Sequence, residues 1–233
     1  MLYLLYCIMK APVVDGAPAM AGVTGKAVSF ITAHGLVAAI SELDAVKNAP
    51  PVAELVVYGR VIEELFRMQA VVPMRYGCVL DGMPAVSRLL EEKKREYGEL
   101  LDELDGHVEM GIRILLPEQM VKPRPEVPPA DGCGYLAMRK AHYSMRDQHS
   151  LHHQALMERY VQAFSGLQCE HRAETATRDG AIILSLYYLV PKSQVGLFRE
   201  IFQRAVEQEG SKTLISGPWP PYNFAAPEIA PEV

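Results

Sequence analysis

The residues from Val108 to Leu116 alternate between apolar and other residues at every position except Leu115, and this pattern constrains the fold more than any other in the chain. Valine, methionine, isoleucine or leucine occupies every even position, whereas Glu109, Gly111 and Arg113 lie between them. Strict alternation is typical of a strand with one buried face. We therefore predict a half-buried strand here, in a sheet that covers a hydrophobic core.

Five further elements are predicted after this strand. A long helix, a polar edge strand, an almost wholly apolar central strand, a second helix and a short last strand are expected at about 135–165, 169–175, 181–190, 193–209 and 212–215. The resulting order, βαββαβ, is that of a ferredoxin-like domain. We expect this C-terminal domain over residues 107–224, followed by a tail at residues 225–233.

The first 106 residues predict a related but modified unit. Strands are expected at about 2–9, 27–32, 36–41 and 71–80, with helices from Pro50-Pro51 to about residue 69 and over about 82–104. Three strands before the first helix depart from the ferredoxin-like order. The fold class is therefore α+β with two domains, a modified ferredoxin-like domain at 1–106 and a ferredoxin-like domain at 107–224, and a proline- and aromatic-rich C-terminal tail.

Composition restricts the compartment and the partners. The net charge of −5 gives no basic footprint for nucleic acid. The four cysteines are far apart in the sequence, which is typical of reduced, buried residues and not of a disulfide frame. No apolar run approaches the roughly 20 residues of a membrane span, and the apolar run Leu2–Met9 lacks the basic start of a secretory signal. We expect a cytoplasmic protein that contacts no lipid membrane.

The segment Ile215–Phe224 is the least ordinary in the chain, because it contains the only tryptophan and three prolines. Prolines restrict the backbone, so the aromatic rings around them can be held in place at little entropic cost. One interpretation is a clamp that covers an open edge of the core; the other is a docking surface for a partner. The candidate partner-binding residues here are Trp219, Pro220, Pro221, Tyr222 and Phe224.

Arg75 is the charged residue that interrupts an otherwise apolar predicted strand, and Tyr76 follows it. One interpretation pairs Arg75 with a carboxylate such as Glu109. The other places Arg75 and Tyr76 at a partner-binding crevice between the two domains. Both residues are therefore candidates for the binding site.

Two sequence features resemble a metal site and a dinucleotide-binding site, but each lacks a part that such a site requires. Histidines at positions 142, 149, 152 and 153 lie on the predicted long helix, but no His-Glu-x-x-His motif accompanies them. Gly132–Ala137 imitates a dinucleotide fingerprint, yet a proline-rich loop precedes it where a strand is needed. We therefore expect no catalytic residue, no metal and no cofactor. A small-molecule- or metal-binding enzyme on ferredoxin-like domains, based on the histidine helix, is the alternative.

Segments along nearly the whole chain resemble the gas vesicle accessory proteins GvpF and GvpL. The most specific is Ser-Gly-Pro-Trp-Pro-Pro-Tyr at 216–222, followed by a small residue and Phe224. Others fall in the family's order: Gly25–Val28 through Ala38–Glu42, Val72–Gly77, Gly106–Gly111 and Leu186–Val190. Tyr58-Gly59 departs from the His-Glu of many members.

The resemblance implies a non-enzymatic accessory protein of gas vesicle formation with two domains of the kind predicted above. Such proteins bind the small, hydrophobic shell protein GvpA and other accessory Gvp proteins. The resemblance thus implies these partners for this chain, a place in the cytoplasm in association with gas vesicles, and a role in buoyancy. A soluble carrier of this kind needs a partly apolar surface that prevents premature aggregation of the subunit.

Overall fold

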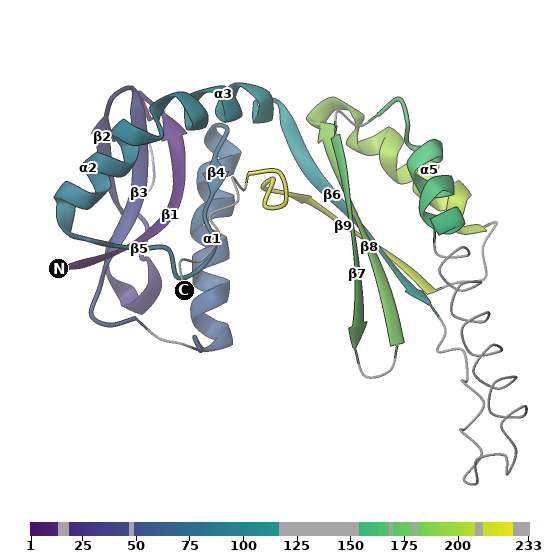
Figure 1. The fold of residues 1–233 in the computed structure, drawn as a ribbon, viewed down its shortest axis with the longest axis horizontal. Helices are drawn as coiled ribbons and strands as arrows, with labels where there is room; N and C mark the ends of the chain where they lie inside the picture. The colour runs from purple at the N-terminus through teal and green to yellow at the C-terminus, as the bar shows by residue number, and fades with distance from the viewer. Residues whose placement is uncertain are drawn as a thin grey trace, which may run out of the picture. The chain divides into compact units, whose positions relative to one another are not determined.

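The computed structural model describes residues 1–13, 19–46, 49–116, 154–167, 170–178, 181–207 and 212–225 (Figure 1). The chain forms two compact units. The first comprises Met1–Glu109 together with Gly217–Val233, and the second comprises Met110–Ser216. The C-terminal segment therefore belongs to the first unit, whereas the sequence placed residues up to 224 with the second half of the chain.

The first unit is built around one central strand. Its sheet has the order β2-β3-β1-β4, with β5 also beside β1; the strands are β1 (Leu2–Lys10), β2 (Ser29–Ala33), β3 (Leu36–Leu43), β4 (Val72–Pro73) and β5 (Val79–Asp81). Every residue from Leu4 to Met9 is fully buried. Because both faces of β1 are covered, its sequence is continuously apolar, as predicted.

β2 and β3 form the predicted hairpin. Ala33 pairs with Leu36, so only His34 and Gly35 form the loop. Both loop residues have positive φ angles, 54° and 82°. Two-residue loops of this kind match the twist of the flanking strands, and Gly35 adopts its φ without steric cost.

Two predicted elements of the first unit are interrupted. The expected strand over residues 71–80 is divided into β4 and β5 by a turn. In this turn the Cys78 N–H donates to the Arg75 carbonyl at 3.2 Å, and Gly77 has a φ of 95°. The expected helix over residues 82–104 is α2 (Gly82–Glu92) and α3 (Lys94–Leu104), separated at Lys93 with ψ 9°. The apolar stripe continues across this break, since Leu90 and Tyr97, seven residues apart, are both buried.

The second unit contains the predicted mixture of helices and strands. Its sheet has the order β7-β8-β6-β9, with β6 (His107–Leu116), β7 (Glu170–Arg178), β8 (Ala181–Pro191) and β9 (Lys212–Trp219). Residues 154–163 and α5 (Val195–Glu207) are helical. In the core, the Phe164 ring stacks on Phe198 at 4.3 Å and lies 5.2 Å from Tyr188.

Two strand predictions in this region need correction. β6 exposes Arg113 and Leu115, but Glu109 and Gly111 are buried, so the half of the strand before Arg113 is covered on both faces. Asn223 lies on Glu109, and Ser216 lies over Gly111, where an added Cβ would be 2.7 Å from the Ser216 hydroxyl. β9 also continues past residue 215 to Trp219. It is an edge strand, where proline is tolerated because no outward N–H is needed.

Several predictions fall on residues outside the described ranges. These are the first part of the helix predicted at 135–165, the histidines at 142, 149, 152 and 153, and the glycine motif at 132–137. Within the described ranges, none of the helices combines the length and the apolar character needed to cross a membrane.

Tyr97 on α3 predicts a sensitivity of the first unit to alkaline pH. Its side chain is fully buried, its hydroxyl has no hydrogen-bond partner among the described residues, and burial raises its pKa to about 12. The unfolded state loses this proton near pH 10, whereas the folded state keeps it until about pH 12. The free energy of unfolding is therefore unaffected by Tyr97 below pH 10 and falls by about 3 kcal/mol as the pH rises from 10 to 12.

We expect Tyr97→Phe to reduce the loss of stability between pH 9 and pH 12, measured by urea unfolding at each pH. At pH 7 the variant should be as stable as the parent or more stable, because phenylalanine leaves no buried hydroxyl unsatisfied. An unchanged pH profile would show that Tyr97 titrates as it does in water.

Candidate partner-binding site

The C-terminal segment divides into an inward and an outward set of side chains. Phe224 is 4% exposed, and Pro220, Pro221 and Ala225 are also buried. Trp219 and Tyr222 remain 41% and 37% exposed. The segment therefore has a buried end that is fixed on the first unit and two aromatic rings that are accessible from solvent.

A buried carboxylate holds the turn that carries these rings. Glu109 on β6 is 4% exposed, and its two oxygens accept hydrogen bonds from the backbone N–H and the side-chain amide of Asn223, each at 2.7 Å. The Tyr222 N–H donates to the Pro220 carbonyl at 2.8 Å within the same turn. Hydrogen bonds to a charged acceptor are about twice as strong as neutral ones, so Glu109 fixes the segment in one conformation.

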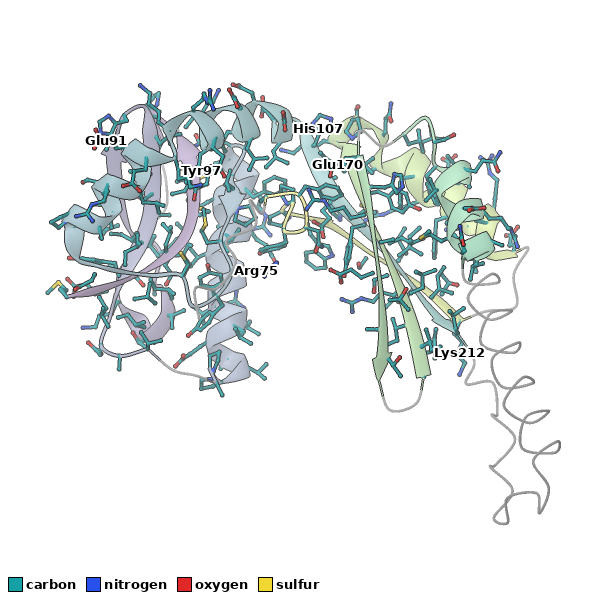
Figure 2. The ribbon with its side chains drawn as sticks, viewed as in Figure 1. Arg75, Glu91, Tyr97, His107, Glu170 and Lys212 are labelled. Atoms are coloured by element: carbon teal, nitrogen blue, oxygen red, sulfur yellow. The ribbon has the colours of Figure 1, made fainter. Side chains whose placement is uncertain are left out.

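Arg75 lies elsewhere than the predicted pairing with Glu109 suggests. It is exposed on the turn between β4 and β5 (Figure 2), and it forms no ion pair with any residue in the described ranges. Its backbone carbonyl accepts from the Cys78 N–H. Asn223, which no sequence pattern singled out, is the residue that bonds to Glu109 instead.

Tyr222 is only partly open to solvent. Burial raises the pKa of its hydroxyl, and Glu63 on α1 (Val52–Met68) raises it further. The buried Cys7 on β1 also contributes to this shift. Tyr222 is therefore held near β1 and α1 of the first unit, with one part of its ring desolvated and the other part accessible.

Tyr76 joins a cluster of tyrosines centred on Tyr58 of α1. The Tyr58 ring stacks on Tyr6 with centroids 5.0 Å apart and meets Tyr76 edge-on at 5.1 Å. The Tyr58 hydroxyl lies 2.8 Å from the Leu5 carbonyl and 3.0 Å from the Met74 carbonyl, to either of which it can donate. Tyr58 thus connects α1 to β1 and to the turn that carries the two candidate residues Arg75 and Tyr76.

The electrostatics of this cluster keep its hydroxyls protonated. Burial raises the pKa of Tyr58. Burial and a hydrogen bond to Glu54 on α1, at 3.0 Å, raise the pKa of Tyr76 to about 12. At neutral pH these groups are donors, so the cluster positions the turn and offers no general base.

The sequence did not predict that Tyr58 and Glu54 position the turn at Arg75 and Tyr76. It also did not predict that Glu109 and Asn223 anchor the C-terminal segment. Tyr58 was visible only as a departure from the His-Glu of related sequences. A signal for Glu109 was present, because a carboxylate in an alternating strand needs a partner when that face is covered. Nothing in the sequence identified Asn223 as that partner.

The arrangement supports binding of apolar surface. Trp219 and Tyr222 are accessible in the first unit, and so are three aliphatic residues near the start of α1, Val52, Leu55 and Val56. The described residues contain no group of three or more His, Cys, Asp or Glu side chains able to hold a metal ion. What the site offers chemically is therefore aromatic and aliphatic contact area.

Comparison with known proteins gives a consistent result. The model of the family described as "Gas vesicle synthesis protein GvpL/GvpF" matches residues 2–226. Gas vesicle protein L of a Streptomyces species is 29% identical over 178 residues, which span 71% of this chain and 66% of that protein. Gas vesicle protein F1 of Halobacterium salinarum is 24% identical over 205 residues, which span 84% of this chain and 80% of that protein.

Two crystal structures have the same fold. GvpF from an Anabaena species superposes with a TM-score of 0.81 at 16% identity, over 97% of this chain and 96% of that one. GvpF from Microcystis aeruginosa gives a TM-score of 0.77 at 18% identity, over 97% and 99% of the two chains. At these identities the likeness concerns the fold alone.

Proposed function

Since this chain belongs to the GvpL/GvpF family of gas vesicle synthesis proteins, we propose that it is a non-enzymatic carrier that binds the hydrophobic shell protein GvpA during vesicle formation. It acts in the cytoplasm, in association with the growing vesicles. The observation that carries the proposal is the pair of accessible rings, Trp219 and Tyr222, on a segment fixed by Glu109 and Phe224.

The anchoring of this segment supports a binding role. Aromatic residues supply much of the energy in protein interfaces. A surface that is ordered before binding loses less conformational entropy when the partner arrives. Here Asn223 and Phe224 fix the turn, so Trp219 and Tyr222 are presented in a defined geometry.

Arg75 and Tyr76 are proposed as a second contact region. Arg75 is exposed, whereas Tyr76 is fixed by Glu54 and by the edge of the Tyr58 ring. Arginine and aromatic residues are both enriched at protein interfaces. Other accessory Gvp proteins are further partners of the proposed role, whereas nucleic acid and lipid membranes have no part in it.

We also propose that the sheet of the second unit belongs to a ferredoxin-like domain. Its strand order is β7-β8-β6-β9. A βαββαβ chain has this order when its last strand, here β9, lies beside its first strand, here β6. The first unit is then a modified form, with a domain boundary near residue 106. Residues 225–233 form the terminal tail in this proposal.

The proposal is tested by co-expressing GvpA with the tagged chain and comparing the parent with a Trp219→Ala, Tyr222→Ala double variant. We expect the parent to retain soluble GvpA on the affinity resin. The double variant should retain about 30-fold less GvpA, because loss of an aromatic anchor costs about 2 kcal/mol in a typical interface.

A Val195→Ala, Leu197→Ala double variant is the matched control, since Leu197 is an exposed apolar residue of α5 in the second unit. Circular dichroism checks that every variant is folded. If the parent and the folded Trp219→Ala, Tyr222→Ala variant retain GvpA equally, the segment only covers the core and does not bind GvpA.

A further inference from the structure

A cavity of about 440 Å³ lies between the two helical segments of the second unit, the helix at residues 154–163 and α5. This volume is in the range of small-molecule sites, roughly 300–1,000 Å³. The lining positions include 159, 162 and 163 on the first helix and 201, 204 and 205 on the second. Because residues three and four apart share one face of a helix, each helix presents one face to the same space.

The rim of the cavity is cationic. Arg159 lies on one helix and Arg204 on the other, and both residues are exposed. No aspartate or glutamate occurs among the described residues that line the cavity. A guanidinium group carries five N–H donors in a planar fork and has no acceptor. The two arginines therefore favour an anion that accepts several hydrogen bonds.

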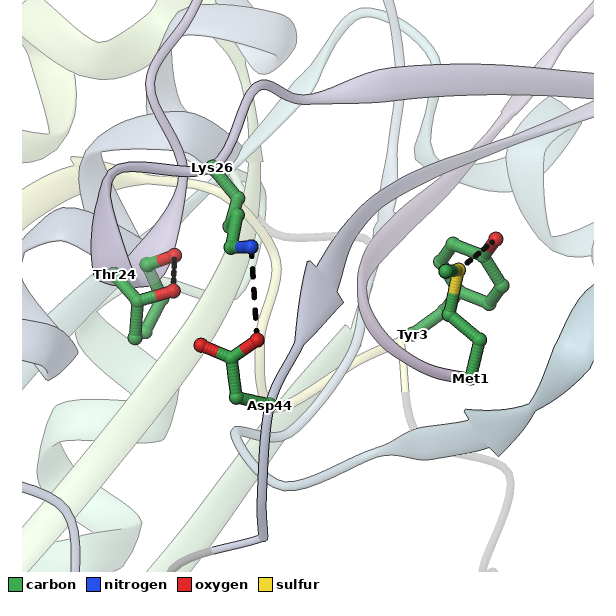
Figure 3. A network of polar contacts seen from close by, with 6 residues as sticks. Met1, Tyr3, Thr24, Lys26 and Asp44 are labelled. Atoms are coloured by element: carbon green, nitrogen blue, oxygen red, sulfur yellow. Dashed lines mark hydrogen bonds and ion pairs between the residues drawn. The ribbon is translucent and has the colours of Figure 1, made fainter.

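An ion pair outside the cavity leaves Arg204 available to a ligand. One guanidinium nitrogen of Arg204 lies 3.5 Å from Glu200, one turn earlier on α5, and the two side chains are 70% and 65% exposed. The first unit has an exposed pair of the same kind, Lys26 with Asp44 at 3.6 Å (Figure 3). Such pairs contribute little to stability, so a ligand oxygen can replace Glu200 at small cost.

The interior of the cavity combines apolar surface with buried hydroxyl groups. Ala163, Ile201 and Ala205 supply apolar contact area, and Tyr160, which also lines the cavity, is buried. Burial raises the pKa of the nearby Tyr188, and Tyr160 raises it further. The Tyr188 hydroxyl is therefore a donor at neutral pH, and the described part of the chain provides no acceptor for it.

Water alone does not complete this arrangement. A space bordered by charged side chains is not dry. Two guanidinium groups of like charge that border the same space repel each other, and water screens this repulsion without neutralising it. An anion between Arg159 and Arg204 replaces the repulsion by two attractions.

We propose that this cavity binds a small molecule that carries an oxyanion, either a phosphate or a carboxylate, on an apolar body. Arg159 and Arg204 hold the oxyanion, because the guanidinium fork matches two oxygens of either group. The apolar body contacts Ala163, Ile201 and Ala205. The site belongs to the second unit, and the inference goes beyond the carrier function, which rests on the C-terminal segment.

Isothermal titration calorimetry of the full chain tests the site with phenyl phosphate, benzoate and inorganic phosphate. In about 150 mM NaCl, which screens exposed charges beyond about 8 Å, we expect one equivalent of phenyl phosphate or benzoate to bind. The tighter of the two identifies the preferred oxyanion. Inorganic phosphate should bind about tenfold more weakly than phenyl phosphate, because it buries no apolar surface. Absence of saturable binding by all three probes would overturn the inference.

Arginine variants test the cationic rim. Arg159→Gln and Arg204→Gln should each weaken binding of the tighter probe by about tenfold, because each removes charge-assisted hydrogen bonds. Lys26→Gln is the matched control, since it also removes one positive charge and one exposed ion pair, but on the first unit. It should leave the affinity unchanged. Equal weakening by all three variants would assign the binding to the overall charge of the chain and contradict the site.

A variant that fills the cavity tests the apolar wall. Ala205→Leu replaces a methyl group by an isobutyl group and keeps both arginines, and leucine is also a good helix former. We expect it to abolish probe binding. Gln203→Leu, at an exposed position of α5 that is not among the described lining residues, is the matched control and should bind as the parent does. Undiminished binding by Ala205→Leu, shown to be folded by circular dichroism, would place the ligand outside the cavity.

The outcomes are independent of the carrier function. The titrations contain no GvpA, so a failure to bind any probe removes the proposed cavity site and leaves the carrier function standing. Conversely, a chain that retains no GvpA but binds phenyl phosphate in the predicted manner keeps this site and loses the carrier function.

Discussion

Phe224→Ala should lower the free energy of unfolding of the first unit by about 3–5 kcal/mol, the usual cost of removing a buried phenylalanine ring. Phe224 is 4% exposed, and the adjoining Ala225 is 2% exposed. Its ring therefore belongs to the core of a unit whose larger part, Met1–Glu109, precedes it by more than a hundred positions. The variant leaves a cavity and releases the turn that Asn223 anchors.

Urea unfolding monitored by circular dichroism measures this effect. Trp219→Ala is the matched control, because its ring is 41% exposed and surface substitutions usually change stability by about 0.5 kcal/mol. The difference between the two variants separates the buried from the accessible end of the segment. A change below about 1 kcal/mol for Phe224→Ala would contradict the placement of this ring in the core.

Gly22→Ala should destabilise the first unit by about 3 kcal/mol, through overpacking and the loss of buried hydrogen bonds. A Cβ at this position would overlap the Tyr6 hydroxyl and lie 3.0 Å from the Ser41 hydroxyl. These two hydroxyls are hydrogen-bonded at 2.8 Å, and the Val23 N–H donates to Tyr6 at 2.8 Å. The added methyl group displaces the Tyr6 hydroxyl, which takes part in both hydrogen bonds.

The Tyr6→Phe background tests whether the clash is the cause. Removing the hydroxyl takes away the nearest atom, so Gly22→Ala should cost less in Tyr6→Phe than in the parent, which gives a non-additive double-mutant cycle. Gly59→Ala is the control, since nothing lies within 4 Å of its added Cβ. It should stabilise α1 by about 1 kcal/mol, because alanine is the better helix former. Additive effects of Gly22→Ala and Tyr6→Phe would exclude the clash.

Local pattern predicted where most strands and helices of the described ranges lie, but not all of their breaks and ends. β1 is continuously apolar because it is covered on both faces, and the hairpin loop follows from Gly35. The break at Lys93 could not be predicted, because the apolar stripe passes through it unchanged. The turn after Met74 was missed for a similar reason, since the apolar sequence continues on both sides of it.

The candidate site was predictable only in part. Proline and aromatic content indicated Trp219, Tyr222 and Phe224, yet the sequence did not distinguish the buried ring from the accessible ones. That distinction depends on Glu109 and Asn223, which are 114 positions apart. A hydrogen bond over such a separation has no local signature.

The most direct test of the carrier function is the mass of the material recovered when this chain and GvpA are co-expressed and purified on the tagged chain. We expect static light scattering to give one soluble species, heavier than the 25.8 kDa monomer by a whole number of GvpA subunits. Insoluble GvpA beside a folded chain that elutes at its own mass would contradict the account.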